Sequence, residues 1–406
     1  MAFALCFIVT SMYVLFEVYG NEATQVFQKH LGSILHNQTD ETPPFIKAIT
    51  DPTDKTYIRL SCPEIGARYN PLKAPNVTQS SSFLKTATTM PIKYFFAMDL
   101  YNSWHVMPSL FTAIYQAIEF LGPDRCAVSI VEGRSTDGTY DAIIEFGVLM
   151  DSIGTKFYLG RNDSDPRDGV HDRILSLAGL RNQALRPLSE DRHLFSPDAN
   201  VIFLNDVVIC VDDILEMIHQ HIAQNAHMTC AMDWNDKDGG ILFYDVWVAR
   251  AINGDTFFEV PQSAEWRYAE NLFWNEPDSK AKLDRREPFQ VYACWNGGAV
   301  FTAKPIMNGE IEFRIAVENE CYMGEPTLFC KDLWRRGYGR IQTLPTVNVA
   351  YSIPDAKKTK SVRGRVGDTV DQLSEVANDV MIDWQGPPPM VKCAHDWWRP
   401  HWVPPL

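Results

Sequence analysis

The chain has 406 residues, of which 46% are hydrophobic and 22% charged, so it has the composition of a globular protein with a sizeable core. Its length fits one large domain or two fused halves. The net charge of −14 argues against a nucleic-acid partner, because non-specific binding to phosphates requires a basic surface.

The chain begins with an apolar stretch, AFALCFIVTSMYVLF, at residues 2–16. This stretch is shorter than the roughly 20 residues that span a bilayer, and it lacks the basic segment that opens a signal peptide. Residues 1–20 are therefore interpreted as a short signal-anchor that attaches the chain to a membrane. The alternative is a short buried helix.

Three N-glycosylation sequons favour the secretory route, and they lie at Asn37, Asn76 and Asn162. Thr, Ser, Pro and Asn are frequent before residue 91. This composition is typical of irregular structure, so residues 21–91 are predicted to form a stem or lead-in region.

Nine cysteines are spread along the chain, and none of them forms a CxxC pair. This spacing argues against a zinc ribbon and against a dense disulfide framework. Cys126, Cys210 and Cys230 lie in apolar runs, and we predict that they are buried thiols.

From residue 92 onward, short apolar runs alternate with segments of helical spacing. The runs predict strands at 93–100, 125–133, 155–160, 200–210, 228–234, 241–250, 289–301 and 340–351. The other segments predict helices at 106–121, 138–152, 173–188, 212–226 and 326–337. This alternation indicates an α/β fold with a parallel sheet, and such sheets bind ligands at the carboxyl ends of their strands.

The segment VEGRSTDGTYDAI (131–143) places acids and hydroxyls in a turn between a strand and a helix. Glu132, Ser135 and Asp137 could hydrogen-bond a base or a ribose at this turn. The alternative is a plain helix cap formed by Thr136 or Asp137. The segment is not a GxGxxG fingerprint, which argues against a dehydrogenase.

The segment FLNDVVICVDD (203–213) places Asp206 directly after a predicted buried strand. Mg²⁺ and Mn²⁺ prefer oxygen ligands and accept one or two carboxylates together with substrate phosphates. We therefore predict that Asp206 binds a divalent metal. Asp212 and Asp213 are instead predicted to cap the helix that follows.

Two later segments add candidate site residues. CWNGGAVF (294–301) contains paired glycines that let a backbone approach a ligand closely. Glu325 then opens the next predicted helix, where it could meet a reacting sugar or an acceptor. Its alternative role is to satisfy the positive end of the helix dipole.

Three further residues have both a functional and a structural interpretation. Arg181 and Asn182 lie on the helix before the predicted metal strand, and Arg181 could bind phosphate through two guanidinium N–H groups. The alternative is a solvated helix face. His395 near the C-terminus could complete a metal site or lie on the surface of an aromatic tail.

The order of these motifs resembles the GT-A glycosyltransferases. VEGRSTDGT is similar to the D-G-S-T-D-G-T turn of family 2 enzymes, and LNDV stands where that fold carries its DxD metal motif. WNGGAVF followed by GEPTLFCKDLWRRGYGRI is similar to the glycine-rich segment and the E-D helix of family 2.

More closely, the chain resembles glycosyltransferase family 69, the fungal capsule-associated α-1,3-mannosyltransferases, over about residues 92–355. The segments that carry this resemblance are FFAMDLYNSWHVMPSL, VSIVEGRSTDGTYD, LAGLRNQALRPL, VIFLNDVVIC, DILEMI, AMDW, FYDVWVARAINGD, CWNGGAVF and LFCKDLW.

The resemblance implies a GT-A-like, Rossmann-type mixed sheet flanked by helices. It implies GDP-mannose as donor, Mn²⁺ or Mg²⁺ as cofactor, a mannan or capsule-type glycan as acceptor, and an α-1,3 linkage with retained configuration. It also implies a type II Golgi membrane protein with a lumenal catalytic domain. Residues 92–235 would bind the nucleotide sugar, and residues 236–406 would bind the acceptor and include a C-terminal tail.

The resemblance also implies roles for the candidate residues. Asp206 would be catalytic through the metal, with His395 as a further metal ligand, and Glu325 would stabilise the reacting sugar or position the acceptor hydroxyl. The nucleotide sugar would be bound by Glu132, Ser135, Asp137, Arg181, Asn182, Asn205, Trp295, Asn296 and Gly297.

Two departures from the wider pattern bear on these roles. The metal motif is Asn205-Asp206-Val207 rather than a full DxD, and Pro326 replaces the Asp of the E-D pair, which suits a retaining enzyme. The alternatives are a transferase that uses another nucleotide sugar, or a non-catalytic glycan-binding or scaffold protein with the same fold. A glycoside hydrolase would require two carboxylates across a cleft, and the nucleotide-type motifs do not favour it.

Overall fold

The structure is a computed structural model that describes residues 43–74, 90–237, 239–261, 263, 265–370, 379–395 and 399–405. The chain divides into two compact units, Met1–Pro44 and Phe45–Leu406. The predicted signal-anchor lies outside the described residues, as does most of the predicted stem. Among the helices that are described, none has the length and apolar character needed to cross a bilayer.

The second unit is built on a mixed sheet with the order β3-β2-β1-β4-β9-β5-β10-β8-β7, and β6 pairs with β5. The strands are β1 (Ile92–Leu100), β2 (Cys126–Glu132), β3 (Lys156–Arg161), β4 (Phe195–Leu204), β5 (Met228–Lys237), β6 (Gly240–Phe243), β7 (Arg250–Ala251), β8 (Phe289–Ala293), β9 (Gly298–Thr302) and β10 (Ile341–Ala350). Two short strands, β11 (Val391–Cys393) and β12 (His401–Val403), form a separate hairpin.

Most strands of this sheet run in one direction. β1 is parallel to β2 and to β4, β2 is parallel to β3, and β10 is parallel to β5. β9 is antiparallel to both β4 and β5, so β5 points the same way as β4. The carboxyl ends of six strands therefore meet at one edge, and the first residue of β9, Gly298, lies there as well.

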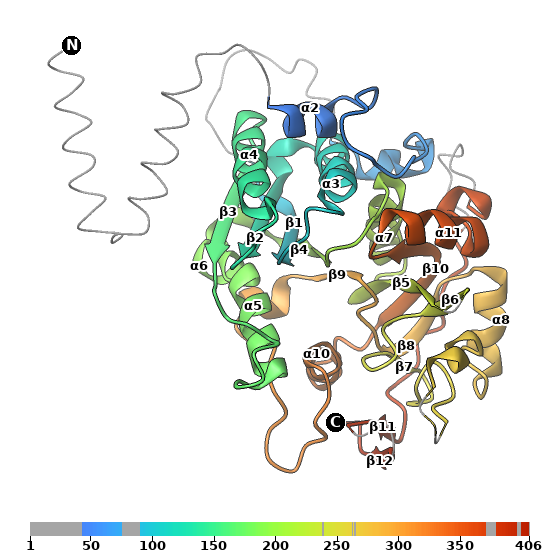
Figure 1. Cartoon of the computed structure of the whole chain (residues 1–406). Coiled ribbons are helices and arrows are strands. Elements are labelled where there is room, and N and C mark those ends of the chain that lie inside the picture. The colour runs from blue at the N-terminus through green and yellow to red at the C-terminus, as the bar shows by residue number, and fades with distance from the viewer. Residues whose placement is uncertain are drawn as a thin grey trace, which may run out of the picture. The chain divides into compact units, whose positions relative to one another are not determined.

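Helices cover both faces of the sheet, which accounts for the strands being buried on both sides (Figure 1). Residues of α3 (Met107–Leu121), α4 (Thr139–Ser152) and α7 (Val211–Ala223) belong to one hydrophobic core. Residues of α5 (Arg173–Leu185), α6 (Pro187–Glu190) and α10 (Glu325–Arg335) belong to a second core. The remaining helices are α2 (Pro44–Thr50), α8 (Pro277–Arg285), α9 (Lys304–Met307) and α11 (Ile353–Arg363).

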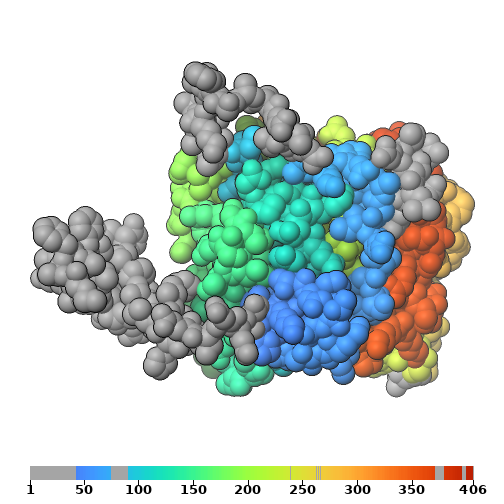
Figure 2. Space-filling view, turned by 90° about the horizontal axis from the view of Figure 1, so that it is seen from above, coloured from blue at the N-terminus to red at the C-terminus, as the bar shows by residue number. Residues whose placement is uncertain are grey.

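Residues 45–74 lie over the first of these helix layers, as Figure 2 shows in blue. Phe45 packs against Phe111 of α3 at 6.0 Å between ring centroids. Arg68 donates hydrogen bonds of 2.9 and 3.0 Å to the buried Glu216 of α7. Residues 45–74 of the predicted lead-in region thus belong to the second unit and contribute to its core.

The predicted mixed α/β sheet flanked by helices is confirmed, and the first five strands and four helices occur in the predicted order. One predicted strand, 289–301, is wrong, because it is two strands separated by a turn at Cys294–Gly297. Asn296 and Gly297 have φ values of 54° and 78°, which no strand accommodates. The predicted strand at 241–250 is likewise divided into β6 and β7.

Three disulfides join segments that are distant in sequence: Cys62–Cys210, Cys230–Cys294 and Cys321–Cys393. The prediction of buried thiols is therefore wrong for Cys210 and Cys230 and confirmed for Cys126, which is buried and free. Their partners lie 148 and 64 residues away, so the apolar runs around them contain no sign of the pairing.

Candidate active site at the carboxyl edge of the sheet

The turn after β4 brings Asp206 to the carboxyl edge of the sheet. Asn205 donates its backbone N–H to the carbonyl of Gly297 at 3.0 Å, which fixes this turn against the start of β9. Burial raises the pKa of the Asp206 carboxyl, and a backbone hydrogen bond at Asp206 and the neighbouring Arg167 only partly oppose the shift. Among the described residues, no other side chain is hydrogen-bonded or ion-paired to this carboxylate. It is a hard oxygen donor available to an ion.

A pocket of about 440 Å³ opens beside Asp206, within the size range usual for small-molecule sites. Its lining includes the carboxylates of Asp99 and Asp206 and three guanidinium groups, those of Arg134, Arg167 and Arg173. Arg134 and Arg167 also lie against the ring of Tyr101, at 4.5 and 5.4 Å from its centroid. The carboxylates suit a metal ion and the arginines suit an anionic ligand, so this pocket could bind both together.

Asp99 is a site residue that the sequence reasoning did not select. It lies near the end of β1, and burial, reinforced by the charges of Asp206 and Glu325, raises its pKa to about 6. Arg181 opposes that rise. The charge of Asp99 therefore interacts with three other site residues, Asp206, Glu325 and Arg181. The available signal was a lone acid inside the apolar run 93–100.

Arg181 and Glu325, both predicted site residues, form an ion pair whose side chains are only 9% and 3% exposed. α5 supplies the arginine and the first turn of α10 supplies the glutamate. The Arg181 guanidinium also lies over the ring of Trp295, 4.4 Å from its centroid. The alternative of a solvated helix face is therefore excluded for Arg181, which is almost completely buried.

The turn at Trp295, Asn296 and Gly297 joins these groups to the carboxyl end of β4. Trp295 donates its indole N–H to the side-chain oxygen of Asn205 at 2.9 Å. Asn296 donates its side-chain amide to the carbonyl of Ala231 at 2.9 Å and is fully buried. The structure thus brings five predicted residues together at one edge: Asn205, Asp206, Trp295, Asn296 and Gly297.

A second pair of acids, the buried Asp233 and the half-buried Asp245, lies beside this turn. Tyr351 donates its hydroxyl to Asp233 at 2.7 Å, and Asn296 donates its backbone N–H to Asp245 at 2.9 Å. Burial raises the pKa of both carboxyls, that of Asp245 to about 6. Asp245 was not predicted, although a lone acid in the apolar run 241–250 was the available signal.

Replacing Gly297 with alanine should destabilise the fold. Its φ of 78° is strained for any residue with a Cβ, and that atom would lie 3.1–3.2 Å from Val349, Asp233 and Val207. Gly309 provides a matched control, because its φ of 67° carries the same strain while no atom lies within 4 Å of an added Cβ.

Urea unfolding should show a loss of about 1 kcal/mol for Gly309→Ala and at least about 1 kcal/mol more for Gly297→Ala. Equal losses for the two variants would mean that close packing at Gly297 contributes nothing to stability.

The three predicted nucleoside-binding residues hold their own turn together. Glu132 accepts a hydrogen bond from the backbone N–H of Ser135 at 2.9 Å. Asp137 accepts from the N–H and the hydroxyl of Thr139, at 3.1 and 2.7 Å, in the first turn of α4. Gly138 is the N-cap of α4, and Asp137, one residue before it, contacts only the first residue of the helix. Arg134 of the same turn lines the pocket, so these residues position the turn beside it.

Two other predicted residues lie away from Asp206. The Asn182 side chain donates an amide N–H to the carbonyl of Phe313 and accepts the backbone N–H of Phe313, both at 2.8 Å. Asn182 therefore anchors the loop that contains Phe313. His395 is exposed and lies edge-on to Tyr322, with 4.9 Å between ring centroids. No contact in the described part of the chain joins His395 to Asp206, and its metal-binding role stays a prediction.

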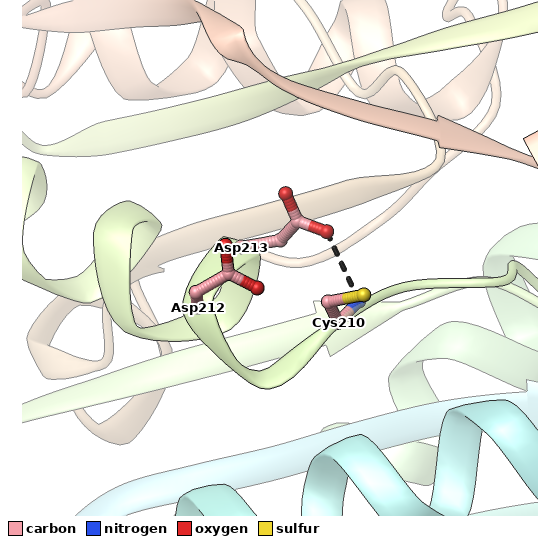
Figure 3. A group of neighbouring side chains, drawn as sticks. All are labelled: Cys210, Asp212 and Asp213. Carbon is pink, nitrogen blue, oxygen red and sulfur yellow. Dashed lines mark hydrogen bonds between the residues drawn. The ribbon is translucent and has the colours of Figure 1, made fainter. Parts of the chain in front are cut away.

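Cys210, Asp212 and Asp213 form another acidic group, shown in Figure 3, but their chemistry does not suit a metal. The Cys210 sulfur is committed to the disulfide with Cys62. Both Asp213 oxygens contact the Lys360 ammonium at 2.6 Å, and one also accepts the Cys210 backbone N–H at 3.0 Å. Asp213 caps α7 as predicted.

Comparison with known proteins identifies the family. Residues 93–332 match the family described as cryptococcal mannosyltransferase 1. The chain belongs to this family of mannosyltransferases. It is 31% identical over 380 residues to the α-1,3-mannosyltransferase CMT1 of Cryptococcus neoformans var. neoformans serotype D, covering 87% of this chain and 78% of that protein. As a member, the chain is a glycosyltransferase.

Two solved structures show a distant likeness to this mannosyltransferase. One is the mannosyltransferase PcManGT from Pyrobaculum calidifontis in complex with GDP-Man and Mn²⁺, at 13% identity and a TM-score of 0.36, covering 65% of this chain and 59% of that chain. The other is GalNAc-T7 with UDP, GalNAc and Mn²⁺, at 12% identity and a TM-score of 0.38, covering 67% and 48%.

Proposed function

We propose that this mannosyltransferase moves mannose from GDP-mannose to a mannose-containing glycan in α-1,3 linkage, with retained configuration and with a divalent metal. The printed activity of its relative CMT1 supports the mannosyl transfer and the linkage. The observation that carries the proposal is the Asp206 carboxylate, which is partly buried in a pocket that also presents three arginines.

The donor set fits the proposed metal. Asp206 and Asp99 are oxygen ligands of the kind that Mn²⁺ and Mg²⁺ prefer, and burial raises the pKa of both although arginines lie nearby. When bound there, the ion would act as a Lewis acid that offsets the charge of the departing diphosphate.

Other residues of the chain would bind the donor, support the site and stabilise charge during the reaction. Arg134, Arg167 and Arg173 would pair with the anionic donor across the pocket. Trp295, which is buried and fixed by Asn205, would support the floor of the site from within and hold the Arg181 guanidinium in place. Glu325, oriented by Arg181, would stabilise positive charge that develops on the sugar ring or orient the acceptor hydroxyl.

The reaction breaks the bond between C1 of mannose and the donor phosphate oxygen. A new bond forms between C1 and the O3 oxygen of the acceptor, on the same face of the ring, and the hydroxyl proton passes to the departing phosphate. The products are GDP and an α-1,3-linked mannoside. This route needs no enzyme nucleophile, which agrees with Pro326 at the position of the second acid.

We further propose that this chemistry takes place in the lumen of the secretory pathway, in a type II protein of the Golgi. The three disulfides support an oxidising compartment, because such bonds are rare in reducing ones.

Ligand-induced thermal stabilisation tests the donor and the metal together. GDP and GDP-mannose should raise the unfolding temperature of the purified protein when Mn²⁺ is present, and much less without it. A ligand at 100 times its Kd adds about 2.7 kcal/mol of stability. A shift with UDP-sugars alone would assign another donor, and no shift with any nucleotide would support the non-catalytic alternative.

A further inference from the structure

Three aromatic side chains from distant segments gather beside Glu325. They are Trp247, Tyr322 and His395, named here the aromatic cluster. Trp247 donates its indole N–H to the carbonyl of Ala394 at 3.0 Å, next to His395. The His395 ring in turn lies 4.9 Å from the Tyr322 ring. None of these three residues lines the pocket beside Asp206.

The C-terminal hairpin builds this cluster through covalent and polar contacts. The Cys321–Cys393 disulfide ties the residue before Tyr322 to β11. Arg250, fully buried, donates hydrogen bonds to the carbonyls of Lys392 at 2.7 Å and of Trp247 at 2.8 Å. A buried guanidinium with carbonyl partners is costly to displace, so the arrangement of the three segments is rigid.

The cluster adjoins the candidate active site on two sides. The Trp247 ring would lie 3.3 Å from a Cβ placed on Gly324, the residue directly before Glu325. The Tyr322 hydroxyl donates to Asp172 at 3.0 Å, and the next residue, Arg173, lines the pocket. Burial, the bond to Asp172 and the charges of Asp172 and Glu325 together raise the pKa of Tyr322 to about 12, so its hydroxyl stays protonated.

The cluster is also open to a ligand. Trp247 and Tyr322 are half-buried and His395 is exposed. Aromatic rings carry partial negative charge on their faces, so they attract the C–H groups on the apolar faces of a pyranose ring. Rings held in place by buried contacts lose little conformational freedom when a ligand binds, which favours binding.

We propose that the aromatic cluster is the subsite for the acceptor saccharide, where a sugar ring packs on Tyr322 and Trp247 and presents its hydroxyl toward Glu325. This inference rests on the proposed mannosyl transfer. It adds which residues select the acceptor, and it assigns the C-terminal hairpin to the site.

The test compares the kinetics of four proteins with GDP-mannose and an α-mannotriose acceptor. Tyr322→Ala should raise the KM for mannotriose at least tenfold and leave the KM for GDP-mannose within about twofold, because of the two substrates only the acceptor would pack on this ring. Tyr322→Phe keeps the ring and loses the bond to Asp172, so its acceptor KM should rise less than threefold. His395→Ala, at an exposed position, should raise the acceptor KM without lowering the unfolding temperature.

Tyr338→Ala is the matched control. Tyr338 packs edge-on against His227 at 5.2 Å, as Tyr322 does against His395, but it lies next to Ile341 at the opposite edge of the sheet. Its removal should leave the acceptor KM unchanged. Equal acceptor KM values for the wild type, Tyr322→Ala and His395→Ala would overturn the proposal and leave the mannosyl transfer standing.

A binding measurement separates the two proposals if transfer is not observed. Calorimetry with mannotriose, GDP and Mn²⁺ requires no chemistry. Weaker mannotriose binding by Tyr322→Ala than by the wild type, by tenfold or more, would support the subsite even if the transfer reaction proved different. Undiminished binding by Tyr322→Ala would count against it.

Discussion

Mannosyl transfer should fall by on the order of a thousandfold when Asp206 is replaced with asparagine. The change keeps the shape of the side chain and removes one of the two charged oxygen ligands proposed for the metal. Loss of about 4 kcal/mol of transition-state stabilisation lowers the rate by this factor, since each 1.4 kcal/mol corresponds to tenfold. The unfolding temperature should stay close to that of the wild type, because no other described side chain is hydrogen-bonded or ion-paired to Asp206.

The same strand provides the control for this prediction. Asp198 lies near the amino end of β4, is exposed, and forms a surface ion pair with Lys93 at 3.1 Å. Asp198→Asn should change neither transfer nor stability by a measurable amount, because exposed ion pairs contribute about 0–1 kcal/mol. Paramagnetic resonance of Mn²⁺ supplies a second readout. Undiminished Mn²⁺ binding by Asp206→Asn would assign the metal to other residues, whatever happens to the rate.

Local pattern predicted those parts of the site that follow strands. Asp206 and the glycine turn stand directly after or between apolar runs, and a parallel sheet gathers such positions at one edge. Asp99 and Asp245 were not predicted as site residues. Each is a single acid inside an apolar run, and such a run indicates only a strand. Their proximity to Arg181 and to the glycine turn depends on pairings between strands that are far apart in sequence.

Long-range pairing also explains the other differences between expectation and structure. Asn182 has the polarity of a ligand-binding residue, but its partner Phe313 is 131 residues away. The disulfides are likewise non-local, and each of them holds a segment of the site. Cys210 follows Asp206 by four residues, Cys294 precedes Trp295, and Cys321 precedes Glu325 by four. Covalent links at these places limit the motion of loops whose side chains must meet the donor and the acceptor.

Substitutions in the Arg181–Glu325 ion pair should have large effects, and they should distinguish a contribution to stability from a contribution to catalysis. Removal of one member of a buried ion pair leaves the other charge without compensation, which costs about 3–5 kcal/mol. Arg181→Met should therefore lower the free energy of urea unfolding by that amount. Glu325→Gln, which keeps the volume, should lower kcat about 100-fold to 1000-fold, the usual effect of removing one group that stabilises transition-state charge.

The double variant Arg181→Met with Glu325→Leu decides between the two roles of the pair. Apolar residues of similar volume commonly restore the stability lost with one member of a buried pair, so its unfolding free energy should return to within about 1–2 kcal/mol of the wild type. Transfer should stay as low as in Glu325→Gln, because the carboxylate beside the sugar is still missing. Recovery of transfer together with stability would make the pair a structural device and would remove Glu325 from the catalytic residues. Stability without transfer would show that a charge buried at the first turn of α10 is retained for the reaction, at a cost to the fold.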